Sequence, residues 1–147
     1  MRAMSRHSNI LIAAIWLIAT PAVAASYQAE LDPVPFDASN RAIVIDSIGN
    51  VAATLDGNAL NIHGTFSNLT SPATTGSVNI GLAKGVPGEA IGNLTVEHAS
   101  HGSFSGSLKL TSAQAAALRK EALYIRIDSE KAPNGNLQGW LEAAGNN

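Results

Sequence analysis

The chain has 147 residues, no cysteine and a formal net charge of −2, and 46% of its residues are hydrophobic while 14% are charged. This length suits one domain with a single core. The low charged fraction excludes a disordered chain and a long solvated coiled coil. The lack of cysteine excludes disulfides, thiolate zinc sites, iron–sulfur clusters and cysteine nucleophiles, so any chemistry must use histidine, carboxylate or hydroxyl groups.

The first 24 residues have the pattern of a secretory signal peptide. Arg2 and Arg6 precede an apolar run from Ile10 to Ala19, and Ala22-Val23-Ala24 has the small-x-small pattern that signal peptidase accepts. The apolar run is about half of the ~20 residues that a membrane-spanning helix needs, so an uncleaved anchor is the less favoured alternative. We expect residues 1–24 to be removed and residues 25–147 to form one secreted or periplasmic domain with no membrane span.

The charge of this expected mature chain argues against nucleic acid as a partner. It contains seven basic and eleven acidic residues, a net charge of −4. Arg119-Lys120 is its only adjacent basic pair, whereas phosphate binding needs a basic stripe with interleaved aromatic residues.

Beyond residue 24 the hydrophobic pattern has period two and is interrupted by turn residues, which predicts short strands. Tyr27 to Leu31 is the first strand, and Asp32-Pro33-Val34-Pro35 ends it because proline has no amide for a ladder. The apolar run Ala42 to Ser47 leads to a turn at Gly49-Asn50 and a strand over Val51 to Leu55.

A hairpin turn and further strands follow. Asp56-Gly57 is the strongest hairpin signal in the chain. The later alternating segments are Leu60 to Phe66, Val78 to Leu82, Leu94 to Val96, Phe104 to Leu110, Ile125 to Ile127, and Leu137 to Leu141. The prediction is eight or nine strands in all.

One short helix is predicted near residues 112–121. Thr111 can cap the first amides, Gln114 stands at the reciprocal capping-box position, and the following Ala-rich segment has high helix propensity. Many short alternating strands with Gly and Asn turns favour an all-β fold, an antiparallel Greek-key β-sandwich. We expect the helix to cross one end of that sandwich.

Several segments, in this order, resemble the chordin (CHRD) domain family, and the resemblance runs from about Tyr27 to Leu141. The closing segment is the most specific. The segments are Ala53-Thr54-Leu55-Asp56-Gly57-Asn58, Leu60 to Leu69 with Ser71-Pro72-Ala73-Thr74, Leu110-Thr111-x-x-Gln114, Leu123-Tyr124-Ile125-x-Ile127 and Pro133 to Leu141.

The resemblance implies a secreted or periplasmic sandwich, immunoglobulin-like or superoxide-dismutase-like, with little guidance on activity. In chordin the domain belongs to a secreted antagonist of growth factors. Many members carry His-x-His and a further His where this chain has Ser77-Val78-Asn79 and Asp128. Serine and asparagine are poor ligands for copper or zinc, so we expect no metal and no cofactor.

Three histidines remain beyond residue 24, and none predicts a site. His98 and His101 stand at a predicted turn, where they could meet a metal only if the loop folded back; solvated turn residues are the preferred interpretation. His63 lies on the polar face of its strand. Asn68 and Asn93 begin N-glycosylation sequons, whose use depends on the source organism.

No catalytic constellation is visible, so we expect a non-enzymatic binding module for a protein or an envelope polymer. The alternative is a metal-binding or dismutase-like protein that uses histidines of the sandwich. Trp140 can face outward from a terminal strand or cover an edge of the core. The candidate interaction surface is His63, Thr65, Ser67, Tyr124, Arg126 and Trp140.

Overall fold

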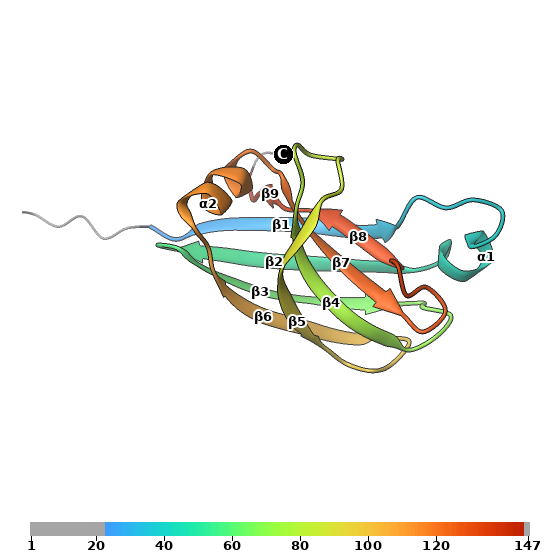
Figure 1. Cartoon of the computed structure of the whole chain (residues 1–147). Coiled ribbons are helices and arrows are strands. Elements are labelled where there is room, and N and C mark those ends of the chain that lie inside the picture. The colour runs from blue at the N-terminus through green and yellow to red at the C-terminus, as the bar shows by residue number, and fades with distance from the viewer. Residues whose placement is uncertain (1–22, 146–147) are drawn as a thin grey trace, which may run out of the picture.

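The computed structural model of the chain describes residues 23–145. The predicted signal peptide therefore lies outside the described residues except for Val23 and Ala24. Within this range the chain forms nine strands and two helices (Figure 1). The elements are β1 (Ala25–Pro33), α1 (Arg41–Val44), β2 (Ile48–Asp56), β3 (Ala59–Ser67), β4 (Ala73–Ile80), β5 (Glu89–Val96), β6 (Gly102–Lys109), α2 (Ser112–Arg119), β7 (Leu123–Ser129), β8 (Leu137–Trp140) and β9 (Glu142–Ala143).

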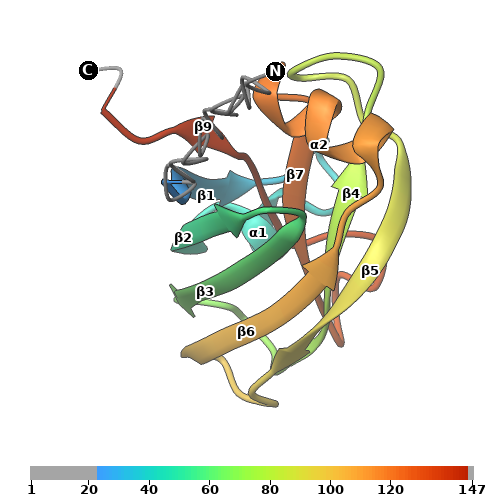
Figure 2. The ribbon, with the colours of Figure 1, turned by 90° about the vertical axis from the view of Figure 1, so that its left-hand side faces the viewer.

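Eight of these strands close into an antiparallel β-barrel. The hydrogen-bonded order is β2-β3-β6-β5-β4-β7-β8-β1, and β1 pairs again with β2 to complete the ring. Figure 2 shows these strands arranged around the molecule. Closure gives every strand of the ring two neighbours, which limits edge-to-edge association, although β5 and β6 pair only at Thr95–Ser105 and Val96–Phe104.

The predicted Greek-key sandwich, immunoglobulin-like or superoxide-dismutase-like, is therefore wrong, although the all-β class is confirmed. The deciding contacts belong to β1. Its residues Ala25 to Leu31 pair with β2, while Asp32 and Pro33 pair with β8. This one long strand is thus hydrogen-bonded to β2 on one side and to β8 on the other. The strands therefore form one continuous barrel wall, whereas a sandwich has two separate sheets.

The short strand β9 lies outside the ring and extends β8 along β1. Gln138 pairs with Asp32, and Glu142 pairs with Gln28 in the same register. The two short strands are separated at Leu141, whose amide donates instead to Leu123 O on β7 (2.9 Å). Trp140 therefore lies at the end of β8, next to the break that separates β8 from β9.

The barrel interior holds the apolar side chains that the period-two pattern predicts. The most deeply buried members include Leu31, Leu60, Phe66, Val78, Phe104, Leu118, Leu123, Ile125, Ile127, Leu137 and Leu141. Most belong to strands, whereas Leu118 comes from α2, at the other end of the molecule from α1 (Figure 1). Helix α2 thus covers one end of the barrel, as it was expected to cover one end of a sandwich.

The N-terminus of α2 confirms the predicted capping box. Thr111 Oγ1 accepts from Gln114 N (3.2 Å), and Gln114 Oε1 accepts from Thr111 N (3.0 Å). The two bonds satisfy amide donors that the helix itself leaves free.

The apolar run Ala42 to Ser47 overlaps helix α1. Two local predictions are wrong. Gly49-Asn50 is not a turn but lies inside β2, where a Cβ on Gly49 would stand 2.7 Å from Thr65 O of β3. Leu82 falls beyond the end of β4 and is 94% exposed.

Candidate functional site

The outer face of β7 is covered by polar contacts and loops. Tyr124, Arg126 and Asp128 point outward because Ile125 and Ile127 between them belong to the core. Outward positions on a barrel are usually solvated, yet Tyr124 is 2% and Asp128 8% exposed. The neighbouring strands and loops therefore cover the outward-facing side chains of this strand.

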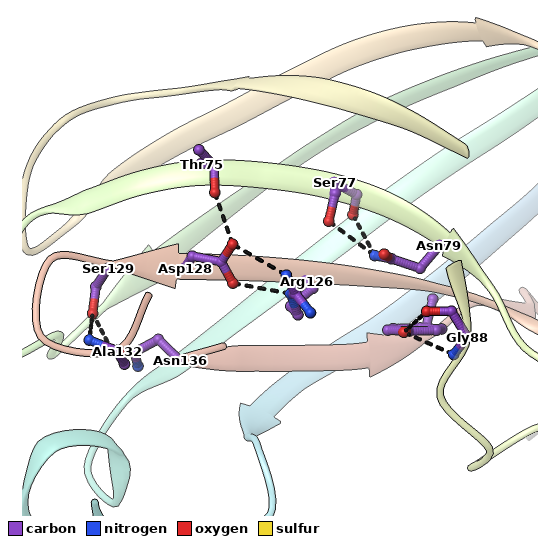
Figure 3. A network of polar contacts seen from close by, with 10 residues as sticks. Thr75, Ser77, Asn79, Gly88, Arg126, Asp128, Ser129, Ala132 and Asn136 are labelled. Carbon is purple, nitrogen blue, oxygen red and sulfur yellow. Dashed lines mark hydrogen bonds and ion pairs between the residues drawn. The ribbon is translucent and has the colours of Figure 1, made fainter. Parts of the chain in front are cut away.

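Arg126 and Asp128 form an ion pair along this strand. Arg126 Nε lies 2.9 Å from Asp128 Oδ1, and Arg126 NH2 donates to Asp128 Oδ2 (3.3 Å). Thr75 on the adjacent β4 donates its hydroxyl to Asp128 Oδ2 (2.8 Å), as Figure 3 shows. Two residues apart on a strand, both side chains stand on one face, so the pair follows directly from the sequence spacing.

Ser77 and Asn79 on β4 lie beside this pair. Asn79 Nδ2 donates to Ser77 Oγ (2.9 Å) and to Ser77 O (3.2 Å) (Figure 3). Their strand register places Ser77 opposite Arg126 and Asn79 opposite Tyr124. Ser77, Asn79 and Asp128, the positions at which the resemblance implies histidines, therefore share one face.

The side chains at these positions do not fit a copper or zinc ion. They offer a hydroxyl, a carboxamide and one carboxylate, and Asp128 already contacts the positive charge of Arg126. Among residues 23–145, no group of three or more His, Asp or Glu side chains could hold a metal ion.

Trp140 on β8 stacks against Tyr124 on β7. The ring centroids are 4.4 Å apart with planes tilted by 38°, so the two rings are in close contact. The Tyr124 hydroxyl accepts from Gly88 N (3.1 Å) and donates to Gly88 O (3.2 Å). Tyr124 therefore joins Trp140 to the β4–β5 loop, residues 81–88.

Lys84 links the same loop to two residues outside it. Its ammonium group lies 3.1 Å from Glu121 and also contacts Glu142. Hydrogen bonds to Glu142 and then Glu121 raise the pKa of Lys84. The loop is thereby fixed to β9 and to the end of α2, next to Trp140.

A hollow, here called the Trp140 groove, opens on the outer faces of β8, β1 and β2. Its volume is about 740 Å³. The polar and aromatic side chains that line it are Gln28, Glu30, Asp32, Asn50, Gln138, Trp140 and Glu142. A second hollow of about 400 Å³, lined by Tyr124, Arg126 and Lys131, shares Gln138 with it.

The Trp140 groove is acidic and amide-rich. Its charged lining residues are Glu30, Asp32 and Glu142, and Glu142 already contacts Lys84. Gln28, Asn50 and Gln138 add three carboxamides. The described lining contains no basic, histidine or hydroxyl side chain.

The structure divides the predicted interaction surface between two sides of the barrel. Tyr124 and Arg126 lie on β7 with Trp140 beside them on β8, whereas His63, Thr65 and Ser67 lie on β3. Three strands separate β3 from β7 in either direction around the ring, so the two groups lie on opposite sides.

The β3 residues face solvent on the far side. His63 is exposed between Ala52 and Ser105, and Ser67 is half-buried. Thr65 alone reaches toward the groove, since its hydroxyl lies 3.4 Å from Asn50 Oδ1.

The loop histidines have different partners. His98 Nδ1 lies 2.8 Å from Ala73 O, and its Nε2 lies 3.2 Å from Glu130. His101 is exposed near Glu97. Both sequon residues, Asn68 and Asn93, are exposed.

Sequence reasoning missed Glu30, Asp32 and Gln138 as lining residues. The alternation along β1 could have placed Glu30 and Asp32 on the outer face, because Tyr27 and Leu31 are buried. No local signal shows that β8 lies against β1, and this pairing forms the groove.

No helix among residues 23–145 is long and apolar enough to cross a membrane.

The comparisons with known proteins agree with the resemblance. A family model described as CHRD domain matches residues 27–141, which include every strand of the barrel. Neither the curated proteins nor the solved structures give a significant match. CHRD domains occur in extracellular and secreted proteins. Since the match covers most of the chain, this protein belongs to the CHRD domain family.

Proposed function

We propose that this protein is a non-catalytic binding module that works outside the cytoplasm, in the periplasm or the medium, and that it binds its partner at the Trp140 groove. The observation that carries the proposal is the position of Trp140. Its side chain is half-buried and lines a hollow of about 740 Å³, and its ring packs against the ring of Tyr124. Tryptophan fixed in this way offers a large contact area at little cost in conformational entropy.

The network of polar contacts next to the groove supports a binding role. The Tyr124 hydroxyl and Lys84 fix the neighbouring loop, and Asp128 with Arg126 fixes the adjacent face. A preorganised site loses less entropy when its partner binds.

The lining chemistry favours binding over catalysis. Without histidine, hydroxyl or lysine side chains, the groove has only carboxylates as reactive groups, and Glu30 and Asp32 are both exposed. A catalytic site ordinarily holds such groups in a buried setting.

Co-sedimentation with the insoluble envelope fraction of the source organism tests this proposal. The full chain is compared with Trp140→Ala, with Gln138→Ala and with Ser105→Ala, an exposed position on β6, which pairs with none of the strands that line the groove. We expect the first two variants to bind at least tenfold less than the parent and Ser105→Ala to bind equally. Gln138→Ala keeps the proposal testable if Trp140→Ala fails to fold.

Equal binding by all four proteins, or no binding by the parent to either the envelope fraction or concentrated medium, would contradict the proposed site. Release of a soluble product from the envelope fraction would contradict the non-catalytic role.

A further inference from the structure

We infer that the ligand of the Trp140 groove is a neutral polysaccharide. This inference rests on the proposed function, because it names the class of partner for the same site. Three properties of the groove carry it: the arrangement of planar polar groups around Trp140, the sign of the charge, and the lack of a free strand edge.

Planar polar side chains surround Trp140 on one outer face. Gln138 and Glu142 lie two residues before and after it, and Glu30 lies on the adjacent strand β1. An indole ring offers an apolar platform to the C–H face of a sugar ring. Carboxamides can donate and accept, and carboxylates can accept, so this set matches the alternating hydroxyl groups of a sugar.

The groove extends beyond the platform in a way that suits a polymer. Gln28 and Asn50 continue the polar lining across β1 and β2, where Asn50 pairs with Glu30 and Gln28 pairs with Ala52. The volume of about 740 Å³ falls within the ~300–1,000 Å³ typical of ligand sites. The groove is thus larger than is needed to bind a single side chain or ion.

Charge excludes anionic polymers and gives little advantage to cationic ones. Glu30, Asp32 and Glu142 would repel phosphate or uronate groups. Glu142 already contacts Lys84, which adds a positive charge at the same end. The two other carboxylates are exposed, and exposed ion pairs contribute only about 0–1 kcal/mol each.

The barrel also disfavours an extended peptide as the ligand. Peptides commonly add a strand to an open sheet edge, but both edges of β1 are occupied, one by β2 and the other by β8 and β9. The aliphatic residues that line the groove are Ala29, Pro33, Val51 and Ala52. They form no deep apolar pocket in which a large peptide side chain could be anchored.

The two tryptophans of the chain, Trp16 and Trp140, allow a direct test. In the full chain, Trp16→Phe leaves Trp140 as the only tryptophan. Its emission is titrated with cellohexaose, xylohexaose, maltohexaose and hexa-N-acetylchitohexaose, with an oligogalacturonate as the anionic control. We expect at least one neutral hexasaccharide to shift or quench the emission saturably, and no response to the oligogalacturonate.

Calorimetry on variants then separates neutral sugar from cationic ligand. With the hexasaccharide that binds, Gln138→Ala should weaken affinity at least fivefold and Ser105→Ala, on β6, should leave it unchanged. The charge-removing variant Glu30→Gln/Asp32→Asn keeps the shape and a carbonyl acceptor at each position, so affinity should stay within threefold, and added salt should have little effect. A tenfold loss in that variant would overturn the inference in favour of a cationic ligand.

The outcomes also separate this inference from the proposed function. If none of the four hexasaccharides binds at millimolar concentration, the inference is overturned. If envelope binding nevertheless depends on Gln138, the proposed function stands with a different ligand. Loss of envelope binding after protease treatment of the envelope would identify that ligand as a protein.

Discussion

Arg126 Nε lies 2.9 Å from Asp128 Oδ1 on the outer face of β7, yet neither atom makes a hydrogen bond, and both are buried. Asp128 has a side chain only 11% exposed, against 34% for Arg126. The pair therefore depends on charge more than on hydrogen-bond direction, and its two members should not be equally sensitive to substitution.

Arg126→Met should destabilise the protein more than Asp128→Asn does. The first change leaves a buried carboxylate with only the Thr75 hydroxyl, which should lower the free energy of unfolding by about 3 kcal/mol. The second keeps the shape and the acceptor for Thr75 and leaves the more exposed Arg126 unpaired, so we expect about 1 kcal/mol. Urea unfolding at neutral pH measures both, and equal losses would contradict this account.

Asn136 is a buried link whose loss should be costly. Its Oδ1 accepts from Ser129 Oγ (2.8 Å; Figure 3). Its Nδ2 donates to Ser47 Oγ (2.8 Å), and all three residues are fully buried. Asn136→Ala leaves both hydroxyls without this partner, so the free energy of unfolding should fall by about 3 kcal/mol. Asn134→Ala, on the exposed part of the same turn, is the control and should cost under ~0.5 kcal/mol.

Gly139 is required where β8 approaches β1. A Cβ at this position would stand 2.2 Å from Glu30 O, which belongs to the backbone and cannot rotate away. Gly139→Ala should therefore lower the free energy of unfolding by about 3 kcal/mol and widen the Trp140 groove.

Gly106→Ala is the matched control, because its nearest contact would be the end of the Leu94 side chain at 2.6 Å. That side chain can move, so thermal unfolding should show a clearly smaller loss. A loss as large as that of Gly139→Ala would show that side-chain crowding, not the backbone contact, decides the effect.

Stability should fall in acid partly through Glu97. Hydrogen bonds from Ser103, first from its amide and then from its hydroxyl, lower the pKa of Glu97 from its ordinary 4.5. A pKa lowered in the folded state gives stability that is complete above the unfolded value and is lost as pH falls through the folded value. Glu97→Gln should thus be less stable than the parent at about pH 7 and equal to it at about pH 2. Chemical unfolding across this range checks the sign, and a pH-independent difference would contradict it.

Local patterns explain what the sequence could predict. The alternation in β3 and β7 identifies inner and outer side chains from the residues alone, and Thr111 with Gln114 defines the start of α2. Asp56-Gly57 correctly predicts a hairpin, with Gly57 at a φ of 60°. These features depend on neighbours within a few residues, so a single sequence contains the necessary information.

Barrel closure depends on contacts that no local pattern contains. Strand β1 must pair with β2 and also with β8, more than 100 residues farther along the chain. Alternation shows that His63 and Arg126 both point outward, but only the ring order shows that they lie on opposite sides. The apolar run Ala42 to Ser47, which overlaps α1, has no clear period, so helix and strand could not be distinguished there.

The Tyr124 hydroxyl should fix the β4–β5 loop without being needed for the stack with Trp140. Tyr124→Phe removes both bonds to Gly88 and keeps the ring, so the free energy of unfolding should fall by about 1 kcal/mol. The amide of Gly88 should exchange with deuterium at least tenfold faster, since its acceptor is lost.

The same variant tests whether loop order and the aromatic platform are separate features. In the Trp16→Phe background, the emission of Trp140 should stay close to that of the parent, because the 4.4 Å stack needs only the ring. The hexasaccharide affinity should then fall less than threefold. Unchanged exchange at Gly88 would mean that Lys84 alone holds the loop, through Glu121 and Glu142.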